Sequence, residues 1–266
     1  MTTRLDSGDL DALAKGFRED GFCILRNVFA RETVDAWSAA FLPLLTRHIA
    51  AEDGRLIRGP GRHYVTLPFL APFADPSVFE NDNVLALVTR LVGDDAVLCQ
   101  LATDTPVDGS DFQDVHRDAK PLFPEAGIET PAFQLALNFP LVDVDENNGP
   151  MEIARGTHVV SRDEGLRLLA SGQTRLEPIF LSRGDALLRD VRGLHRGTPN
   201  PSSIPRPMVV LGYSRGWLLR PEVEIRVPRA TWAGLSERAR KLLRHNPIVD
   251  DAAALPPKES YSEFAY

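Results

Sequence analysis

The chain has 266 residues, of which 43% are hydrophobic and 25% are charged, a composition typical of globular proteins. This length suits one large domain or at most two small ones. Its 37 acidic and 30 basic side chains give a net charge of −7, so the chain lacks the basic surface that nucleic-acid binding requires. Apolar runs such as 208–212 are far too short for a membrane span, and residues 1–10 lack the hydrophobic segment of a secretory signal. We therefore expect an enzyme or binding protein without a nucleic-acid or membrane partner.

The two cysteines point to the cellular compartment. Cys23 and Cys99 both lie in apolar, strand-like segments, where buried free thiols are expected rather than a disulfide framework. Free thiols are typical of a reducing compartment. The sequence therefore predicts a cytoplasmic protein.

The first third of the chain has mainly helical periodicity. Apolar residues recur at helical spacing over 10–19, 31–49 and 83–92, and each segment presents one apolar face. A short strand is expected at 22–28. Residues 54–76 are rich in Gly, Pro and Arg, and we expect them to be irregular.

After residue 94 the pattern changes to short strands separated by turns. The expected strands lie at 96–102, 112–117, 133–142, 176–181, 185–189 and 207–214. Helices are expected at 161–170 and 235–245. These patterns predict a mainly β protein with flanking helices, in one domain spanning 1–266. In it, 1–93 would form a helical N-terminal support, 94–216 a β-barrel core, and 217–266 a C-terminal helix and tail.

Two histidines stand out by their neighbours. His116 and Asp118 form an H-x-D motif after a short apolar run, and residues two apart in a strand point to the same face. His195 ends another strand-like segment, which a barrel could bring opposite the first. Two histidines and one carboxylate on one face of a metal leave three positions open, as non-haem Fe(II) oxygenases require. The motif alone is weak evidence, because a His hydrogen-bonded to an Asp at a strand end has the same pattern.

Arg206 strengthens the metal hypothesis. It follows His195 by eleven residues and a Pro-rich turn, a distance that takes the chain to an antiparallel neighbouring strand. The Arg206 guanidinium would then enter the same pocket and offer two parallel hydrogen bonds to a carboxylate. An iron centre beside a buried arginine suits a keto-acid cosubstrate, which chelates the metal and uses its distal carboxylate to pair with the arginine.

Several segments together resemble one known family over nearly the whole chain. The matching segments are Gly21-Phe22-Cys23-Ile24-Leu25, His116-Arg117-Asp118, Asn148-Gly149-Pro150 through Gly156-Thr157-His158, Gly184-Asp185, His195-Arg196-Gly197-Thr198, and Arg206 with Gly212-Tyr213-Ser214. In this order they resemble the phytanoyl-CoA dioxygenase family of Fe(II)/2-oxoglutarate-dependent oxygenases. The resemblance implies a double-stranded β-helix of the jelly-roll or cupin-like type.

The resemblance also implies a cofactor set and an activity. Fe(II) would bind His116, Asp118 and His195 as metal ligands and catalytic residues, and 2-oxoglutarate would bind Arg206. With O₂, such an enzyme oxidises a small-molecule metabolite and releases succinate and CO₂. Halogenating relatives replace the carboxylate ligand with a small residue, so the retained Asp118 favours hydroxylation over halogenation. Desaturation or ring formation remains open.

Further residues are candidates for binding. Gln113 matches a position where some relatives place a glutamine against the cosubstrate carboxylate, although a solvated loop residue is the alternative. Gln134 and Asn138 share one face of an apolar strand, where buried polar groups need partners. We favour a pocket position for Gln134 and leave Asn138 open. The segment 58–64 could form a lid that recognises a substrate carboxylate or phosphate, or it could be a solvated loop. The lid candidates are Arg58, Arg62, His63 and Tyr64.

Two other classes of function are compatible with the motifs. One is a cupin-like metal enzyme that does not use 2-oxoglutarate, and the presence and spacing of Arg206 argue against it. The other is a non-catalytic binding protein on the same fold, which would not need an intact ligand set. Among substrates, a small metabolite without a CoA thioester is favoured. Nothing in the sequence indicates an oligomeric state.

Overall fold

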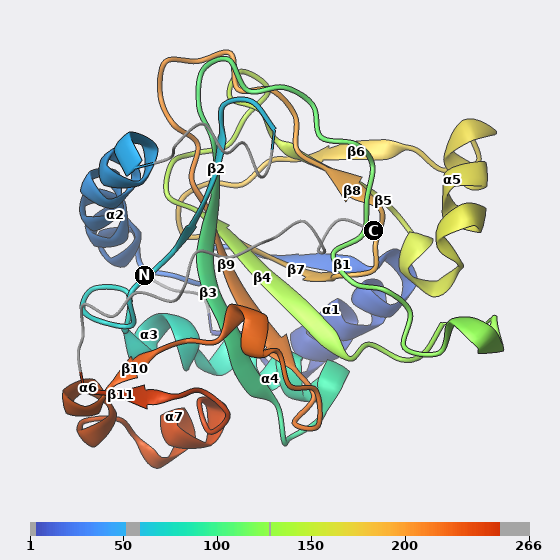
Figure 1. Ribbon diagram of the computed structural model, residues 1–266. Helices are drawn as coiled ribbons and strands as arrows, with labels where there is room; N and C mark the ends of the chain where they lie inside the picture. Colours follow the sequence, from blue (N-terminus) through green and yellow to red (C-terminus); the bar gives the residue numbers. More distant parts are fainter. Residues whose placement is uncertain (1–3, 52–58, 128, 251–266) are drawn as a thin grey trace.

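The computed structural model describes residues 4–51, 59–127 and 129–250, and two antiparallel sheets organise them (Figure 1). The larger sheet has six strands in the order β1-β7-β4-β9-β3-β2, and the smaller has three in the order β6-β5-β8. The strands of the larger sheet are β1 (Phe22–Leu25), β7 (Ala186–Asp190), β4 (Gln134–Pro140), β9 (Met208–Ser214), β3 (Val97–Pro106) and β2 (Arg62–Thr66). The smaller sheet contains β6 (Leu176–Ile179), β5 (Met151–Ala154) and β8 (His195–Arg196).

The chain passes repeatedly between the two sheets. From β4 it enters the smaller sheet for β5 and β6, returns for β7, crosses again for β8 and returns for β9. This alternation is the winding of a double-stranded β-helix, in the jelly-roll and cupin-like class. The predicted fold class is therefore confirmed.

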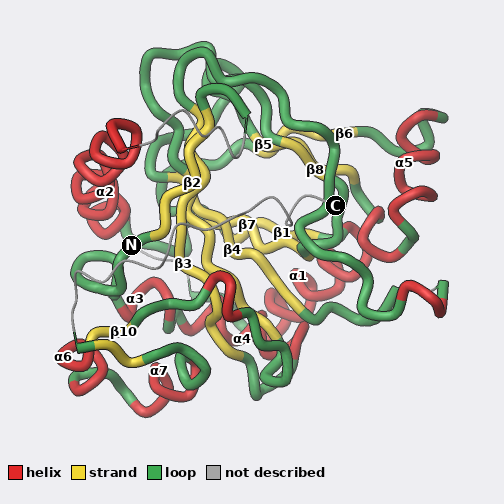
Figure 2. The backbone as a smooth tube through the Cα atoms, in the orientation of Figure 1, coloured by secondary structure: helices red, strands yellow, loops and turns green. Residues whose placement is uncertain are grey.

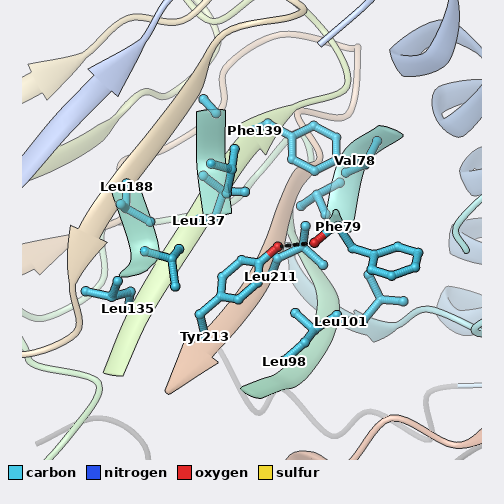
Figure 3. Packing of buried hydrophobic residues seen from close by; sticks show 14 of the residues in the cluster. Val78, Phe79, Leu98, Leu101, Leu135, Leu137, Phe139, Leu188, Leu211 and Tyr213 are labelled. Atoms are coloured by element: carbon cyan, nitrogen blue, oxygen red, sulfur yellow. Dashed lines mark hydrogen bonds between the residues drawn. The ribbon is translucent and has the colours of Figure 1, made fainter. Parts of the chain in front are cut away.

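One face of the larger sheet is covered by helices. On β4, Leu135, Leu137 and Phe139 point into the main apolar core, while the alternate residues Gln134 and Asn138 line a pocket on the other face. Side chains alternate between the two faces of a strand, so one strand supplies both core and pocket. Figure 3 shows this core, in which the Tyr213 hydroxyl donates a 2.9 Å hydrogen bond to the carbonyl of Phe79.

The covering helices follow the predicted apolar stripes. They are α1 (Ser7–Asp20), α2 (Arg31–Ala51), α3 (Pro76–Phe79) and α4 (Asp82–Val92). A capping box at Asp6 and Asp9 starts α1, and Gly21 ends it with a positive φ of 86°. A β-carbon at Gly21 would lie 2.7 Å from Nδ1 of His158, so this position has no room for a side chain.

The remaining α-helices and strands lie at the periphery. They are α5 (Arg162–Ala170), α6 (Arg229–Ala233), α7 (Glu237–Leu242) and the parallel pair β10 (Val227–Pro228) and β11 (Ile248–Val249). Loops gather at the end of the molecule where β2 and β5 lie (Figure 2). None of the helices in the described ranges is both long and apolar enough to cross a membrane. Cys23 and Cys99 are free and buried, as expected.

The structure corrects several sequence expectations. Residues 112–117 are not a strand, because only His116 makes an isolated bridge, to His195. Part of the segment expected to be irregular forms β2, which pairs with β3. The first 93 residues therefore supply two strands of the larger sheet, β1 and β2, in addition to helices. The helix expected at 235–245 is the shorter α7, preceded by α6, and the tail from 251 lies outside the described residues.

Candidate active site

His116, Asp118 and His195 meet at one point between the two sheets. One ligand atom from each lies within 4.8 Å of the others, the only such group of three or more His, Cys, Asp or Glu side chains found among the described residues. Asp118 Oδ1 is 3.7 Å from His116 Nε2, and Asp118 Oδ2 is 3.6 Å from His195 Nε2. The motif residues His116 and Asp118 thus share a site with a histidine that lies far along the chain.

Backbone hydrogen bonds set the orientation of both imidazoles. His116 Nδ1 lies 2.7 Å from the carbonyl oxygen of Asp114, and His195 Nδ1 lies 3.0 Å from that of Gly193. A carbonyl oxygen only accepts, so each Nδ1 carries a proton, and Nε2 is the nitrogen of each ring that is left for a metal. Burial lowers the pKa of His195 to about 3, and the nearby Arg189 cation adds to this shift. His195 is therefore neutral at physiological pH, as a metal ligand must be.

Asp118 is held by a cation from the larger sheet. It lies on a bend outside any strand, and its Oδ2 accepts a 2.5 Å hydrogen bond from Arg189 Nη2 on β7. Burial alone would raise the pKa of Asp118, but Arg189 and the two imidazoles outweigh it and hold the pKa well below its usual range. The carboxylate is thus ionised, with Oδ1 turned toward His116 and Oδ2 bound to Arg189.

Arg206 brings a second buried cation to the same pocket. It is 1% exposed, and its guanidinium makes no hydrogen bond or ion pair with the described residues, its buried Nε included. Burial, together with the neighbouring Arg62, lowers the pKa of Arg206 to about 10, with Asp104 acting in the opposite direction, so the group stays charged near neutral pH. A buried guanidinium without a partner is costly, and an anionic ligand in the pocket would satisfy it.

The donor set fits iron and a keto-dicarboxylate. Two imidazole nitrogens and a carboxylate oxygen that converge from one side are the facial triad of Fe(II) oxygenases. Arg206 lines the same pocket as the triad, and its buried Nε has no hydrogen-bond partner among the described residues. The arrangement of these residues is thus compatible with a bound metal and an anionic cosubstrate.

The structure places the other predicted site residues as follows. Gln113 and Gln134 line the pocket, and Gln113 Oε1 accepts a 3.0 Å hydrogen bond from the Gly197 backbone N–H. Arg62 and Tyr64 also line it, but from β2 rather than from an irregular loop. His63, between them on β2, is buried and does not line the pocket. Arg58 lies outside the described residues.

Arg62 is fixed against the wall of the pocket. Its Nη1 pairs with Asp104 at 2.8 Å and its Nη2 donates to the Thr198 carbonyl at 3.0 Å. A β-carbon at Gly197 would lie 2.5 Å from the Arg62 guanidinium, so only glycine leaves room for it. In this structure Arg62 is therefore a buried, paired residue.

Sequence reasoning missed Arg189 and left Asn138 open. Both line the pocket, and Arg189 Nε donates a 3.0 Å hydrogen bond to Asn138 Oδ1. The sequence offers one sign of Arg189: a charged residue that directly follows the apolar run Ala186–Leu188 within an expected strand. Its partner Asp118 lies 71 residues away, so the pairing is a product of the fold.

Comparison with known proteins gives consistent results. A family model for phytanoyl-CoA dioxygenase (PhyH) matches residues 17–208. Among solved structures, the epimerase SnoN in complex with Fe³⁺, alpha ketoglutarate and nogalamycin RO is similar, with a TM-score of 0.60 and 21% identity over 92% of this chain and 97% of SnoN. HygX from Streptomyces hygroscopicus, with nickel, 2-oxoglutarate and hygromycin B bound, has a TM-score of 0.58 and 19% identity over 81% and 89% of the two chains. EvdMO1 has a TM-score of 0.61 and 22% identity, and the match covers 77% of this chain but half of EvdMO1. At these identities the structural likeness concerns the fold.

Proposed function

Because the chain belongs to the phytanoyl-CoA dioxygenase family and is by type an Fe(II)/2-oxoglutarate-dependent oxygenase, we propose that it hydroxylates a small-molecule metabolite. The observation that carries this proposal is the convergence of His116, Asp118 and His195 beside the unpartnered guanidinium of Arg206. A site without a keto-acid cosubstrate would have no use for a buried, unpaired arginine there.

Each residue has a defined part in the proposed reaction. His116 Nε2, His195 Nε2 and Asp118 would hold iron, and the Arg206 guanidinium would bind the distal carboxylate of 2-oxoglutarate. When bound, iron and 2-oxoglutarate activate O₂ for oxidation of the substrate, with release of succinate and CO₂. The carbonyls of Asp114 and Gly193 keep both Nδ1 atoms protonated, so neither imidazole has to reorient to bind the metal.

The pocket wall fixes the position of the cosubstrate. Gln113 and Gln134 line the pocket with Arg206, and we propose that they contact 2-oxoglutarate. Arg62 and Tyr64 line it from β2 and are candidates for contact with the substrate. Tyr64 is itself held by Gln100, whose Nε2 lies 2.6 Å from the Tyr64 hydroxyl. The apolar lining from Met208, Val210 and Val191 helps to exclude water from the reaction.

For the substrate we propose a small molecule of secondary metabolism. This rests on SnoN and HygX, which resemble this chain in fold and whose structures hold nogalamycin RO and hygromycin B. The retained carboxylate Asp118 supports hydroxylation over halogenation.

Anaerobic optical titration tests the proposed function. Fe(II) and then 2-oxoglutarate are added to metal-free protein, and we expect a visible metal-to-ligand charge-transfer band. His116→Ala should abolish the band, and Arg206→Gln should weaken 2-oxoglutarate binding at least about tenfold, because a charge-assisted pair is lost. Arg183→Gln is a matched control, since Arg183 pairs with Asp35 on α2, outside the pocket lining. Iron-loaded wild-type protein that gives no band would overturn the 2-oxoglutarate proposal in favour of a cupin-like metal enzyme.

A further inference from the structure

Arg189 has more hydrogen-bonding capacity than its structural contacts use. It lies on β7, is 5% exposed and lines the pocket. Its Nε donates to Asn138 at 3.0 Å and its Nη2 donates to Asp118 at 2.5 Å. Its Nη1, buried in the same pocket wall, has no partner among the described residues. Two of the three nitrogens of this guanidinium are thus used, and the third is free to bind a ligand.

Holding Asp118 does not explain the free nitrogen. Nε and Nη2 already fix the guanidinium between Asn138 and Asp118, and Asn138 is fixed in turn by a 3.3 Å hydrogen bond from its Nδ2 to the Val209 carbonyl. An N–H group buried without an acceptor is unfavourable, because it has lost its hydrogen bonds to water. A ligand that accepts from Nη1 would remove that cost when it binds.

The net charge of the pocket lining also favours binding of an anion. Among the described residues that line it, Arg62 pairs with Asp104 and Arg189 with Asp118, while the buried Arg206 forms no ion pair of its own and shares the field of Asp104 with Arg62. Iron would add two positive charges and 2-oxoglutarate two negative ones. These charges cancel, so the buried set keeps one positive charge in excess. An uncompensated buried charge is unfavourable, so a further anion is expected.

We propose that the substrate carries an anionic oxygen group, such as a carboxylate, and that Arg189 Nη1 binds it. The inference rests on the proposed function, because it takes iron and 2-oxoglutarate as bound beside Arg206 and leaves Arg189 Nη1 for the substrate. Arg206 serves the distal carboxylate of the cosubstrate, and Arg189 selects the substrate. The substrate class is therefore a small anionic metabolite.

The test uses a charged and an uncharged probe of the same shape. The full-length protein is loaded anaerobically with Fe(II) and saturating 2-oxoglutarate, so that Arg206 is occupied. Propionate and propionamide are then titrated separately, and the shift of the charge-transfer band reports binding. We expect propionate to bind at least about tenfold more tightly than propionamide, as a charge-assisted hydrogen bond predicts. Arg189→Gln should abolish this preference, Arg189→Lys should keep part of it, and Arg183→Gln should leave it unchanged.

The possible outcomes separate this inference from the proposed function. Wild-type protein that forms the band but binds both probes equally overturns the inference alone. A preference that persists in Arg189→Gln also overturns it, because the anion then binds the metal or another arginine. If Arg189→Gln does not form the band, the test uses Arg189→Lys instead. A preference for propionate over propionamide that is not reduced in Arg189→Lys counts against the inference. Wild-type protein without the band overturns the proposed function and this inference with it.

Discussion

His116 and His195 each donate their backbone N–H to the carbonyl oxygen of the other, and both hydrogen bonds measure 3.0 Å. This reciprocal bridge ties the loop that carries the H-x-D motif to the start of β8. It brings the two imidazole rings to a centroid separation of 4.4 Å. Asp118 is tied to the same segment by its own N–H, which donates to Val191 at 2.9 Å. The geometry of the three candidate metal ligands therefore depends on backbone pairing between one loop and the chain around β8.

A buried charge network supports this loop. Arg117, between two of the metal-ligand candidates, pairs with Glu129 at 2.8 Å, and Glu129 also contacts Arg192 at 3.3 Å. Arg192 in turn pairs with Asp190 at 2.7 Å. The side chains of Arg117 and Arg192 are at most 1% exposed, and that of Glu129 is 6% exposed. Glu129 is thus the carboxylate that joins the two arginines.

We expect Glu129→Gln to lower the free energy of unfolding by about 3–5 kcal/mol, because it leaves two buried cations short of a counter-charge. The matched control is Glu164→Gln, which removes an exposed pair with Arg167 and should change stability far less, because solvent screens that pair. Urea unfolding of both variants measures the difference. Equal effects in the two variants would mean that the buried network contributes no more than a surface pair.

Tyr213 links the larger sheet to α3. Its buried hydroxyl donates to the Phe79 carbonyl at 2.9 Å (Figure 3), and burial raises the pKa of Tyr213 above its usual value. Tyr213→Phe keeps the ring but leaves the carbonyl without this donor. We expect a loss of about 1–3 kcal/mol in urea unfolding, with an unchanged 2-oxoglutarate charge-transfer band. A change in the band without a loss of stability would contradict a purely structural role.

Gly197 gives Arg62 its place in the pocket wall. A β-carbon there would lie 2.5 Å from the Arg62 guanidinium, which is held by Asp104 and the Thr198 carbonyl. We expect Gly197→Ala to displace Arg62 and to destabilise the protein by about 1–3 kcal/mol, the usual range for overpacking. Gly172→Ala is a less suitable comparison because that glycine has a positive φ, so Gly16→Ala, where nothing lies within 4 Å, is the control. Thermal unfolding of the two variants measures whether Gly197→Ala loses stability that Gly16→Ala does not lose.

The sequence predicted local features well and long-range contacts poorly. The apolar stripes of 31–49 and 83–92 correspond to α2 and α4, and the strand expected at 133–142 corresponds to β4. These patterns are readable because each is set within a single element by the burial of one of its faces. The segment that became β2 was missed because its strand is formed by pairing with β3, which composition does not reveal. His116 was expected on a strand, but one bridge to His195 holds it.

The candidate site was predictable only where residues carry a spaced motif. His116, Asp118, His195 and Arg206 could be proposed from their order and spacing. Arg189 could not, because a single arginine in a strand is equally compatible with an exposed edge. Its role follows from the pairing of β7 with β4, which places it beside Asn138 and opposite Asp118.

The buried His158 makes stability depend on pH. Burial is the main cause that lowers its pKa below the ordinary 6.5, and the Arg192 and Arg117 cations act in the same direction while Asp190 opposes them. Below pH 6.5 the unfolded chain therefore binds more protons than the folded protein, so this contribution to stability is complete above pH 6.5. It falls as the pH decreases from there toward the folded-state pKa, with a slope of up to about 1.4 kcal/mol per pH unit.

The variant His158→Leu removes this proton linkage. We expect the free energy of unfolding of the wild type to fall more steeply than that of His158→Leu between pH 7.5 and 5.5, because all other titrating groups are common to both. Urea unfolding at pH 7.5, 6.5 and 5.5 gives the two slopes. His245→Leu is the control, since that histidine is exposed, with its Nε2 2.9 Å from the Gly216 carbonyl. Parallel slopes for wild type and His158→Leu would show that His158 titrates alike in the folded and unfolded states.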